Sequence, residues 1–92
     1  MSEEVKELEI FEMADKFINI ANELVQGQGQ EVGRVGAAIR YAAARFTAHD
    51  ANSKASNLED DKENVIEWYT DQYKKMLVEN IDAHIKLNKS KK

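Results

Sequence analysis

The sequence contains no cysteine and no proline, and it has only four glycines among its 92 residues. The absence of cysteine excludes disulfides, thiolate nucleophiles and zinc sites built on cysteine. The absence of proline permits long helices, and the pair Gly27 and Gly29 marks one short break. No apolar run approaches the roughly 20 residues that a membrane-spanning helix needs. A chain of this length suits a single small domain with a modest core.

Charge is distributed unevenly along a chain whose formal net charge is −4. The start is acidic, whereas Lys86, Lys89, Lys91 and Lys92 make the end basic. The net acidity makes nucleic acid an unfavoured partner. The start, MSEEVKELEIF, lacks the basic-then-apolar order of a signal peptide. These features predict a cytoplasmic protein with no membrane partner.

Residues from about 9 to 26 have the pattern of an amphipathic helix. When successive residues are placed about 100° apart, the apolar ones fill one continuous half of the helix. That half consists of Ile10, Phe11, Met13, Ala14, Phe17, Ile18, Ile20, Ala21, Leu24 and Val25. We expect Gly27 and Gly29 to end this helix, because glycine readily adopts the left-handed conformation found beyond helix ends.

A second helix is predicted from about 31 to 49, and it is apolar nearly all round. Its main stripe consists of Val32, Val35, Ile39, Ala42, Ala43 and Phe46. The opposite side carries Arg34, Tyr41 and Arg45 among small alanines. We expect this helix to lie between the other two, whose apolar faces need a surface to cover. Asp50 would be the next residue on the stripe, so we expect the helix or its burial to end there.

Residues from about 51 to 56 are expected to form a mobile loop, since they are rich in Asn and Ser. Ser56 and Glu59 match a capping box, in which the serine hydroxyl accepts a backbone N–H of the following helix. We therefore expect Ser56 to cap a third helix from about 58 to 87. One face of that helix carries Leu58, Val65, Ile66, Tyr69, Tyr73, Met76, Leu77, Ala83 and Leu87.

Three helical segments without a strand pattern predict an all-α fold. We expect a small three-helix bundle with a long C-terminal helix, in a single domain spanning residues 1–92. The acidic N-terminal tail and the basic C-terminal tail are expected to fray.

The third helix also carries a second apolar set, Val78, Ile81 and Ile85, on its outer side. Three aliphatic residues at this spacing on a polar face are typical of contact with a partner helix. Self-association or binding to another protein would cover this outer set. The alternative is that the chain's own first helix or its tail covers it.

Four residues form a candidate polar site: Arg34, Tyr41, Arg45 and Asn80. Arginine beside tyrosine can hold phosphate or stack on bases. Equally, the arginines could pair with acidic residues of this chain. Asn80 lies in the middle of the third helix's apolar face, where it could anchor a ligand. It could also satisfy its amide by bonding to a loop backbone or a helix terminus.

Residues suited to catalysis or to metal binding are sparse. No serine, threonine or lysine stands in a motif that would activate it, and GQGQEVGRVG lacks the features of a phosphate-binding loop. Only two histidines, His49 and His84, are available as metal ligands, and the spacing around His84 does not match the Glu-x-x-His pattern of di-iron bundles. We predict no catalytic residue, no metal and no cofactor.

Three stretches carry a resemblance that covers residues 10–85. FEMADKFINIANE, GRVGAAIRYAAARFTAHD and DDKENVIEWYTDQYKKMLVENIDAHI together resemble a family of short bacterial proteins catalogued as a domain of unknown function. The most specific pieces are ADxFI with AN, AARF, and YKKML with EN. The resemblance implies an all-helical fold, a bacterial source and no established activity, so no catalytic residue can be transferred.

Overall fold

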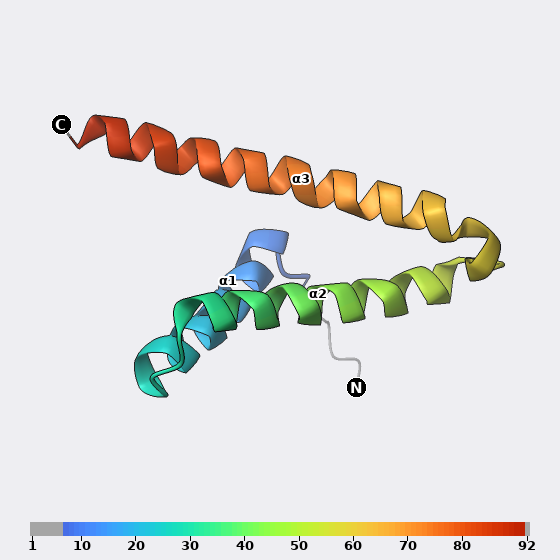
Figure 1. Ribbon diagram of the computed structural model, residues 1–92, viewed down its shortest axis with the longest axis horizontal. Coiled ribbons are helices and arrows are strands. Elements are labelled where there is room, and N and C mark those ends of the chain that lie inside the picture. The colour runs from blue at the N-terminus through green and yellow to red at the C-terminus, as the bar shows by residue number, and fades with distance from the viewer. Residues whose placement is uncertain (1–6, 92) are drawn as a thin grey trace, which may run out of the picture. The chain divides into compact units, whose positions relative to one another are not determined.

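The computed structural model describes residues 7–91, and every regular element within them is helical. The elements are α1 (Ile10–Asn22), the π-helical turn η1 (Glu23–Gly27), α2 (Val32–Lys54) and α3 (Leu58–Ser90), as Figure 1 shows. The all-α class and the long C-terminal helix are therefore confirmed. The expected acidic tail falls largely on residues 1–6, which lie outside the described residues.

The first helical segment ends where its glycines predict. The wider η1 turn continues α1 as far as Gly27, and the backbone N–H of Gln28 donates to the carbonyl of Glu23 at 3.1 Å. Gly29 has a φ of 67°, in the left-handed region that glycine adopts without steric cost. This conformation reverses the chain into α2.

Glu31 caps the start of α2 with its side chain. Its two carboxylate oxygens accept the backbone N–H groups of Gly33 and Arg34, each at 2.9 Å. The first N–H groups of a helix lack the usual carbonyl partner four residues earlier, and the Arg34 N–H also donates to the Glu31 carbonyl at 3.1 Å. A carboxylate also suits the positive end of the helix dipole. The predicted start near residue 31 is thus explained by a specific cap.

The helix α2 does not end before Asp50, as the sequence led us to expect. It continues to Lys54, so most of the predicted loop from Ala51 to Ser56 is helical. Asp50 is tolerated on the stripe because its carboxylate has polar partners, the ammonium of Lys54 and the hydroxyl of Tyr69. Only residues 55–57 separate α2 from α3.

The predicted cap of α3 is also displaced by one residue. Asn57, not Ser56, is the N-cap, and its Oδ1 accepts the backbone N–H of Asp60 at 3.2 Å. Asparagine is among the best N-cap residues, so it takes the position directly before Leu58. At the other end, α3 extends beyond the predicted residue 87 to Ser90, which places most of the expected basic tail within the helix.

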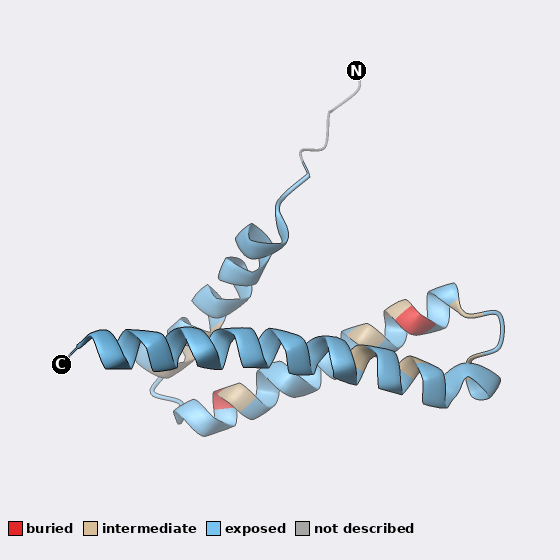
Figure 2. Cartoon of the chain, turned by 90° about the horizontal axis from the view of Figure 1, so that it is seen from above, coloured by how far each residue is buried: buried red, intermediate tan, exposed pale blue. Residues whose placement is uncertain are grey.

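The chain divides into two compact units, Met1–Ala48 and His49–Lys92, which are described separately. In the described part of the first unit, the only buried residue is Val35, and the half-buried ones are Ala21, Leu24, Val25, Gly36 and Thr47. In the described part of the second unit, the only buried residue is Ala51, and the half-buried ones are Asp50, Ala55, Leu58, Val65 and Tyr69 (Figure 2). Each unit therefore has a small local core.

The described apolar faces are more exposed than a packed bundle predicts. The expectation that the face of α3 from Tyr73 to Leu87 is covered is not met, because residues 71–91 are all exposed. The second unit contains only residues 49–57 beside α3, and its buried and half-buried residues end at Tyr69. The rest of α3 therefore has no packing partner within its own unit.

Candidate functional site

The arginine–tyrosine candidates lie on α2 in the first unit. The guanidinium carbon of Arg45 lies 5.0 Å from the centroid of the Tyr41 ring, a cation–π distance. Tyr41 is 66% exposed, so this pair is open to solvent. Such a pair holds a cation on the surface and could meet an anionic group.

Arg34 makes its contact through its backbone, whereas the sequence offered its side chain as part of an anion-binding site. Its backbone N–H donates to Glu31, as part of the cap of α2. The structure thus brings Arg45 onto the ring of Tyr41, whereas Arg34 takes part in the cap of α2 through its backbone.

Asn80 is exposed on α3 and satisfies its amide locally. Its Nδ2 donates to the backbone carbonyl of Met76, one turn earlier, at 2.7 Å. The sequence placed this amide in a buried apolar face and offered a loop or a helix terminus as its partner. The structure corrects both points, because the partner is a carbonyl within the same helix and the site is solvated.

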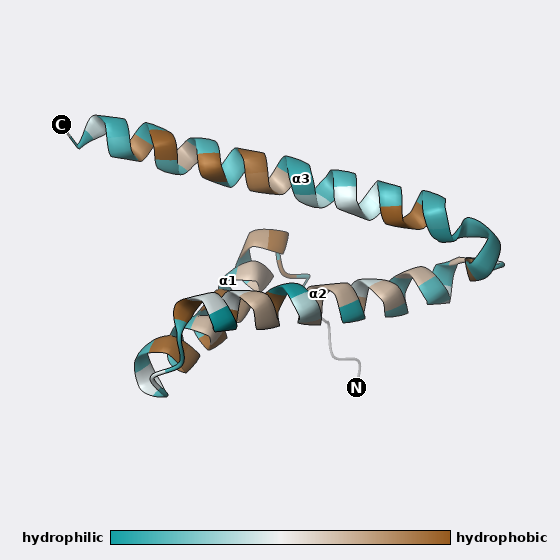
Figure 3. Ribbon diagram, viewed as in Figure 1, coloured by the Kyte–Doolittle hydropathy of each residue, from teal (hydrophilic) through white to brown (hydrophobic). Residues whose placement is uncertain are grey.

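The outer set is exposed along the second half of α3. Val78 and Ile81 are each 49% exposed and Ile85 is 46% exposed. Figure 3 shows hydrophobic segments recurring along this half of the helix. The inner face is equally open, with exposed fractions of 50% for Met76 and 44% for Leu77. The far end of α3, residues 71–90, therefore presents apolar side chains on more than one side.

A polar cluster that sequence reasoning missed lies where α2 meets α3. Asp50 Oδ2 accepts a hydrogen bond from the Tyr69 hydroxyl at 3.0 Å and forms an ion pair with Lys54 Nζ at 3.2 Å. The ring of Tyr69 meets that of Trp68 edge-on, with centroids 4.9 Å apart. We call Asp50, Lys54 and Tyr69 the polar corner. A lysine four residues after Asp50 was the signal that could have predicted part of it.

The polar corner shifts the pKa values of Asp50 and Tyr69 in opposite directions. The hydrogen bonds from Lys54 and then from Tyr69 stabilise the charged carboxylate, which lowers the pKa of Asp50. The hydrogen bond to Asp50 holds the phenol proton, which raises the pKa of Tyr69. A carboxylate with a lowered pKa is a poor general base near neutrality, so this geometry suits a structural tie.

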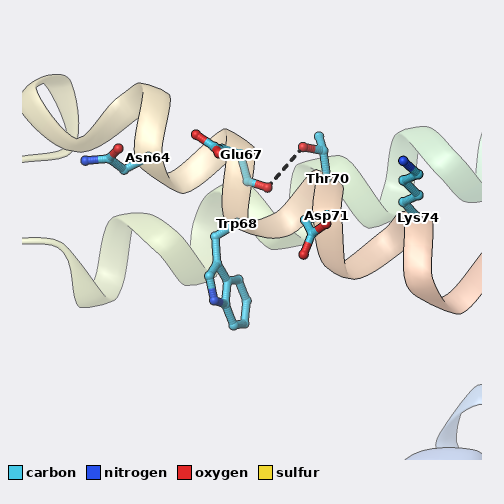
Figure 4. Close-up of a pocket in the computed structure, with 6 residues that line it drawn as sticks. All are labelled: Asn64, Glu67, Trp68, Thr70, Asp71 and Lys74. Atoms are coloured by element: carbon cyan, nitrogen blue, oxygen red, sulfur yellow. Dashed lines mark hydrogen bonds between the residues drawn. The ribbon is translucent and has the colours of Figure 1, made fainter.

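A shallow hollow of about 640 Å³ lies along one side of α3 (Figure 4). Its lining residues are Asn64, Glu67, Trp68, Thr70, Asp71 and Lys74. All of them belong to α3, so no second element closes the hollow. Ligand pockets usually enclose most of their ligand. The hydroxyl of Thr70 is also engaged, since it donates to the carbonyls of Ile66 and Glu67. This hollow has the geometry of an open surface.

Within residues 7–91, no group of three or more histidine, aspartate or glutamate side chains is placed to hold a metal ion. No helix in the same part of the chain is long and apolar enough to cross a membrane.

Comparisons with known proteins place the chain in a family. Neither the curated proteins nor the solved structures contain a match to this sequence. One family, described as "Protein of unknown function (DUF3144)", matches residues 10–85, the range over which the resemblance was expected. Because the match covers most of the chain, including all of α1 and α2 and most of α3, this protein belongs to the DUF3144 family.

Proposed function

We propose that this protein is a non-enzymatic helical module that associates with itself through exposed apolar faces. The observation that carries the proposal is the outer set, Val78, Ile81 and Ile85, which lies on a part of α3 where every residue is exposed. Single exposed apolar residues are ordinary, but a row of them at helical spacing is typical of an interaction surface.

The apolar area of the outer set indicates how much free energy its burial by a partner would contribute. Covering the exposed half of each outer-set side chain contributes about 2 kcal/mol, at about 25 cal/mol per Å² of apolar area. Three such side chains contribute about 6 kcal/mol, while association costs about 4–15 kcal/mol. The outer set alone is therefore marginal, and a stable contact needs a second apolar face.

The chemistry available in the chain supports a role other than catalysis. The sequence has no activated nucleophile motif, and the carboxylate of the polar corner is tied to two partners. A bacterial source and a cytoplasmic location belong to the same proposal, supported by the family resemblance and by the charge pattern of the sequence.

Light scattering after size exclusion, across a concentration series, tests self-association. We expect a mass above the 10.5 kDa of one chain that increases with concentration. In Ile81→Arg we expect a shift toward the monomer, because the charge would be buried in the contact. Ile66→Arg is the matched control, since Ile66 lies on the same helix with a similar exposed fraction, 51%. A strict monomer at the highest concentration would refute the proposal.

A second candidate function is the binding of a small anionic ligand or of nucleic acid. The exposed Arg45–Tyr41 pair favours it, with Arg34 and Asn80 as the further residues predicted from the sequence. This function predicts a thermal shift with an anionic metabolite, or salt-sensitive binding to a short oligonucleotide, that Arg45→Gln abolishes. A broad screen without either response would argue against it.

A further inference from the structure

The outer set of α3 needs an occupant of suitable shape and charge. Building on the self-association proposed above, we propose that the outer set binds the apolar face of α1 from a second copy of the chain. The contact is reciprocal, so that each chain supplies one α1 and one α3 to a two-fold dimer. Charge complementarity and apolar area carry this assignment.

Two lysines frame the outer set along the helix. Lys74 precedes Val78 by four residues and Lys89 follows Ile85 by four, so both lie on the same side of α3 as the outer set. They are 15 residues apart, which corresponds to about 22 Å. An occupant with acidic groups at a similar spacing would meet a cation at each end.

The apolar face of α1 is framed by acidic groups at such a spacing. Glu9 lies directly before Ile10 and Glu23 directly after Asn22, 14 residues apart and about 21 Å along the helix. Both glutamates fall on one edge of the apolar face, and Lys16 lies on the same edge midway between them. Antiparallel or parallel, an α1 laid on the outer set brings its two carboxylates near Lys74 and Lys89.

The other helices of a second copy fit the outer set less well. Two outer sets facing each other would oppose lysine to lysine in either direction. The helix α2 carries Arg34, Arg40 and Arg45, so its exposed charge has the same sign as Lys74 and Lys89. Among the described helices, α1 is the one that combines a wide apolar face with a carboxylate at each end of one edge.

The exposed area matches what a stable dimer requires. The large apolar side chains of α1 that remain exposed, by 41–79%, are Ile10, Phe11, Met13, Phe17, Ile18 and Ile20. Together with the outer set they present about 1,000 Å² per chain, taking about 200 Å² for a fully exposed large side chain. A standard interface buries about 800 Å² per partner. The second apolar face that the outer set needs is therefore available on α1.

Two charge-reversal variants test this contact. Variant A carries Glu9→Lys with Glu23→Lys, and variant B carries Lys74→Glu with Lys89→Glu. Alone, each variant opposes like charges at both contacts, so we expect the dimer dissociation constant to rise by about tenfold or more. Mixed in equal amounts, A and B make both contacts complementary, and we expect the mixed dimer to recover the wild-type affinity.

A matched control separates the contact from net charge. Glu63→Lys with Glu67→Lys changes the net charge as variant A does, but at the near end of α3, and should leave association unchanged. Circular dichroism establishes that each variant keeps its helices, and Glu9→Gln with Glu23→Gln gives a milder form of variant A.

The outcomes separate this inference from the function on which it rests. A wild-type chain that stays monomeric refutes both. A wild-type oligomer that neither variant weakens refutes the docking of α1 on α3 and leaves self-association standing. If both variants are monomeric and their mixture remains so, the exchange between copies is refuted. Recovery in the mixture alone supports it, because only a contact between two chains can be repaired by mixing.

Discussion

The two ends of α3 differ in what surrounds them, although they belong to one uninterrupted helix. The near end, residues 58–70, starts at the Asn57 cap, carries half-buried Leu58 and Val65, and is tied to α2 through Tyr69. The far end, residues 71–90, has only exposed residues and one ion pair within the helix, Lys75 with Asp71 at 3.1 Å. The near end explains how the helix is held, and the far end raises the question of why it is so long.

The far end of α3 therefore takes no part in the local core of its unit. Isolated helices are marginal in water, and most helical stability in proteins comes from packing of an apolar face. A helix that runs for 21 residues beyond its last half-buried residue, Tyr69, therefore leaves much apolar surface exposed. The contrast can be measured by making the same change at both ends.

The largest effect is expected from placing a charge in the small core beside the near end. Ala51 is 6% exposed, so Ala51→Asp would bury a carboxylate beside Asp50 and should lower the free energy of unfolding by about 3 kcal/mol. The same substitution at exposed Ala83 should change it by less than about 0.5 kcal/mol. Urea unfolding followed by circular dichroism, at a dilution that keeps the chain monomeric, compares the two. Equal losses would contradict the contrast.

A smaller effect is expected at the cap of α3. Asn57→Ala removes the acceptor for the Asp60 N–H and should lower the free energy of unfolding by about 1 kcal/mol. Ser56→Ala should cost only a few tenths of a kcal/mol, since Ser56 is outside the cap. The same unfolding experiment compares the two substitutions. A larger loss of unfolding free energy for Ser56→Ala than for Asn57→Ala would mean that Ser56 caps the helix, as the sequence predicted.

The fold class could be predicted because helical periodicity depends on local residue order. The apolar half of α1 and the glycines after it placed that segment within a residue or two. The capping box failed because Ser56 and Asn57 are both good N-cap residues, and sequence spacing alone does not decide between neighbours. The end of α2 was predicted too early. A carboxylate on an apolar stripe indicates the end of a buried helix, but Asp50 has polar partners in Lys54 and Tyr69.

The partners of single side chains could not be predicted in this way. Tyr69 lies 19 positions from Asp50, and their hydrogen bond depends on how two helices meet. The hydrogen bond of Asn80 is local, because its partner Met76 is only four residues away. The exposure of Asn80, by contrast, depends on which other elements pack against α3, and local residue order does not determine that. Periodicity identifies which side of a helix is apolar, whereas the burial of that side depends on whether another element packs against it.

The smallest effect is expected in the titration of the polar corner, which distinguishes the near end from the far end without changing the fold. The pKa of Asp50 is lowered in the folded chain, so its contribution to stability is present above the pKa of the unfolded chain, about 4, and is lost as the pH falls through the folded value. The pKa of Tyr69 is raised, so its contribution is present below the unfolded value, about 10, and is lost as the pH rises through the folded one.

Removing one partner at a time should separate the two hydrogen bonds to Asp50. In Lys54→Met the pKa of Asp50 should rise most, because the bond from Lys54 is the larger cause of its lowering, and in Tyr69→Phe it should rise less. Carboxyl titration of Asp50 by nuclear magnetic resonance in the wild-type chain and in each variant measures both changes. A pKa of Asp50 that is unchanged in both variants would mean that the polar corner is not formed in solution. The hydrogen bond that joins α2 to the near end of α3 would then be absent, and the contrast between the two ends would be lost with it.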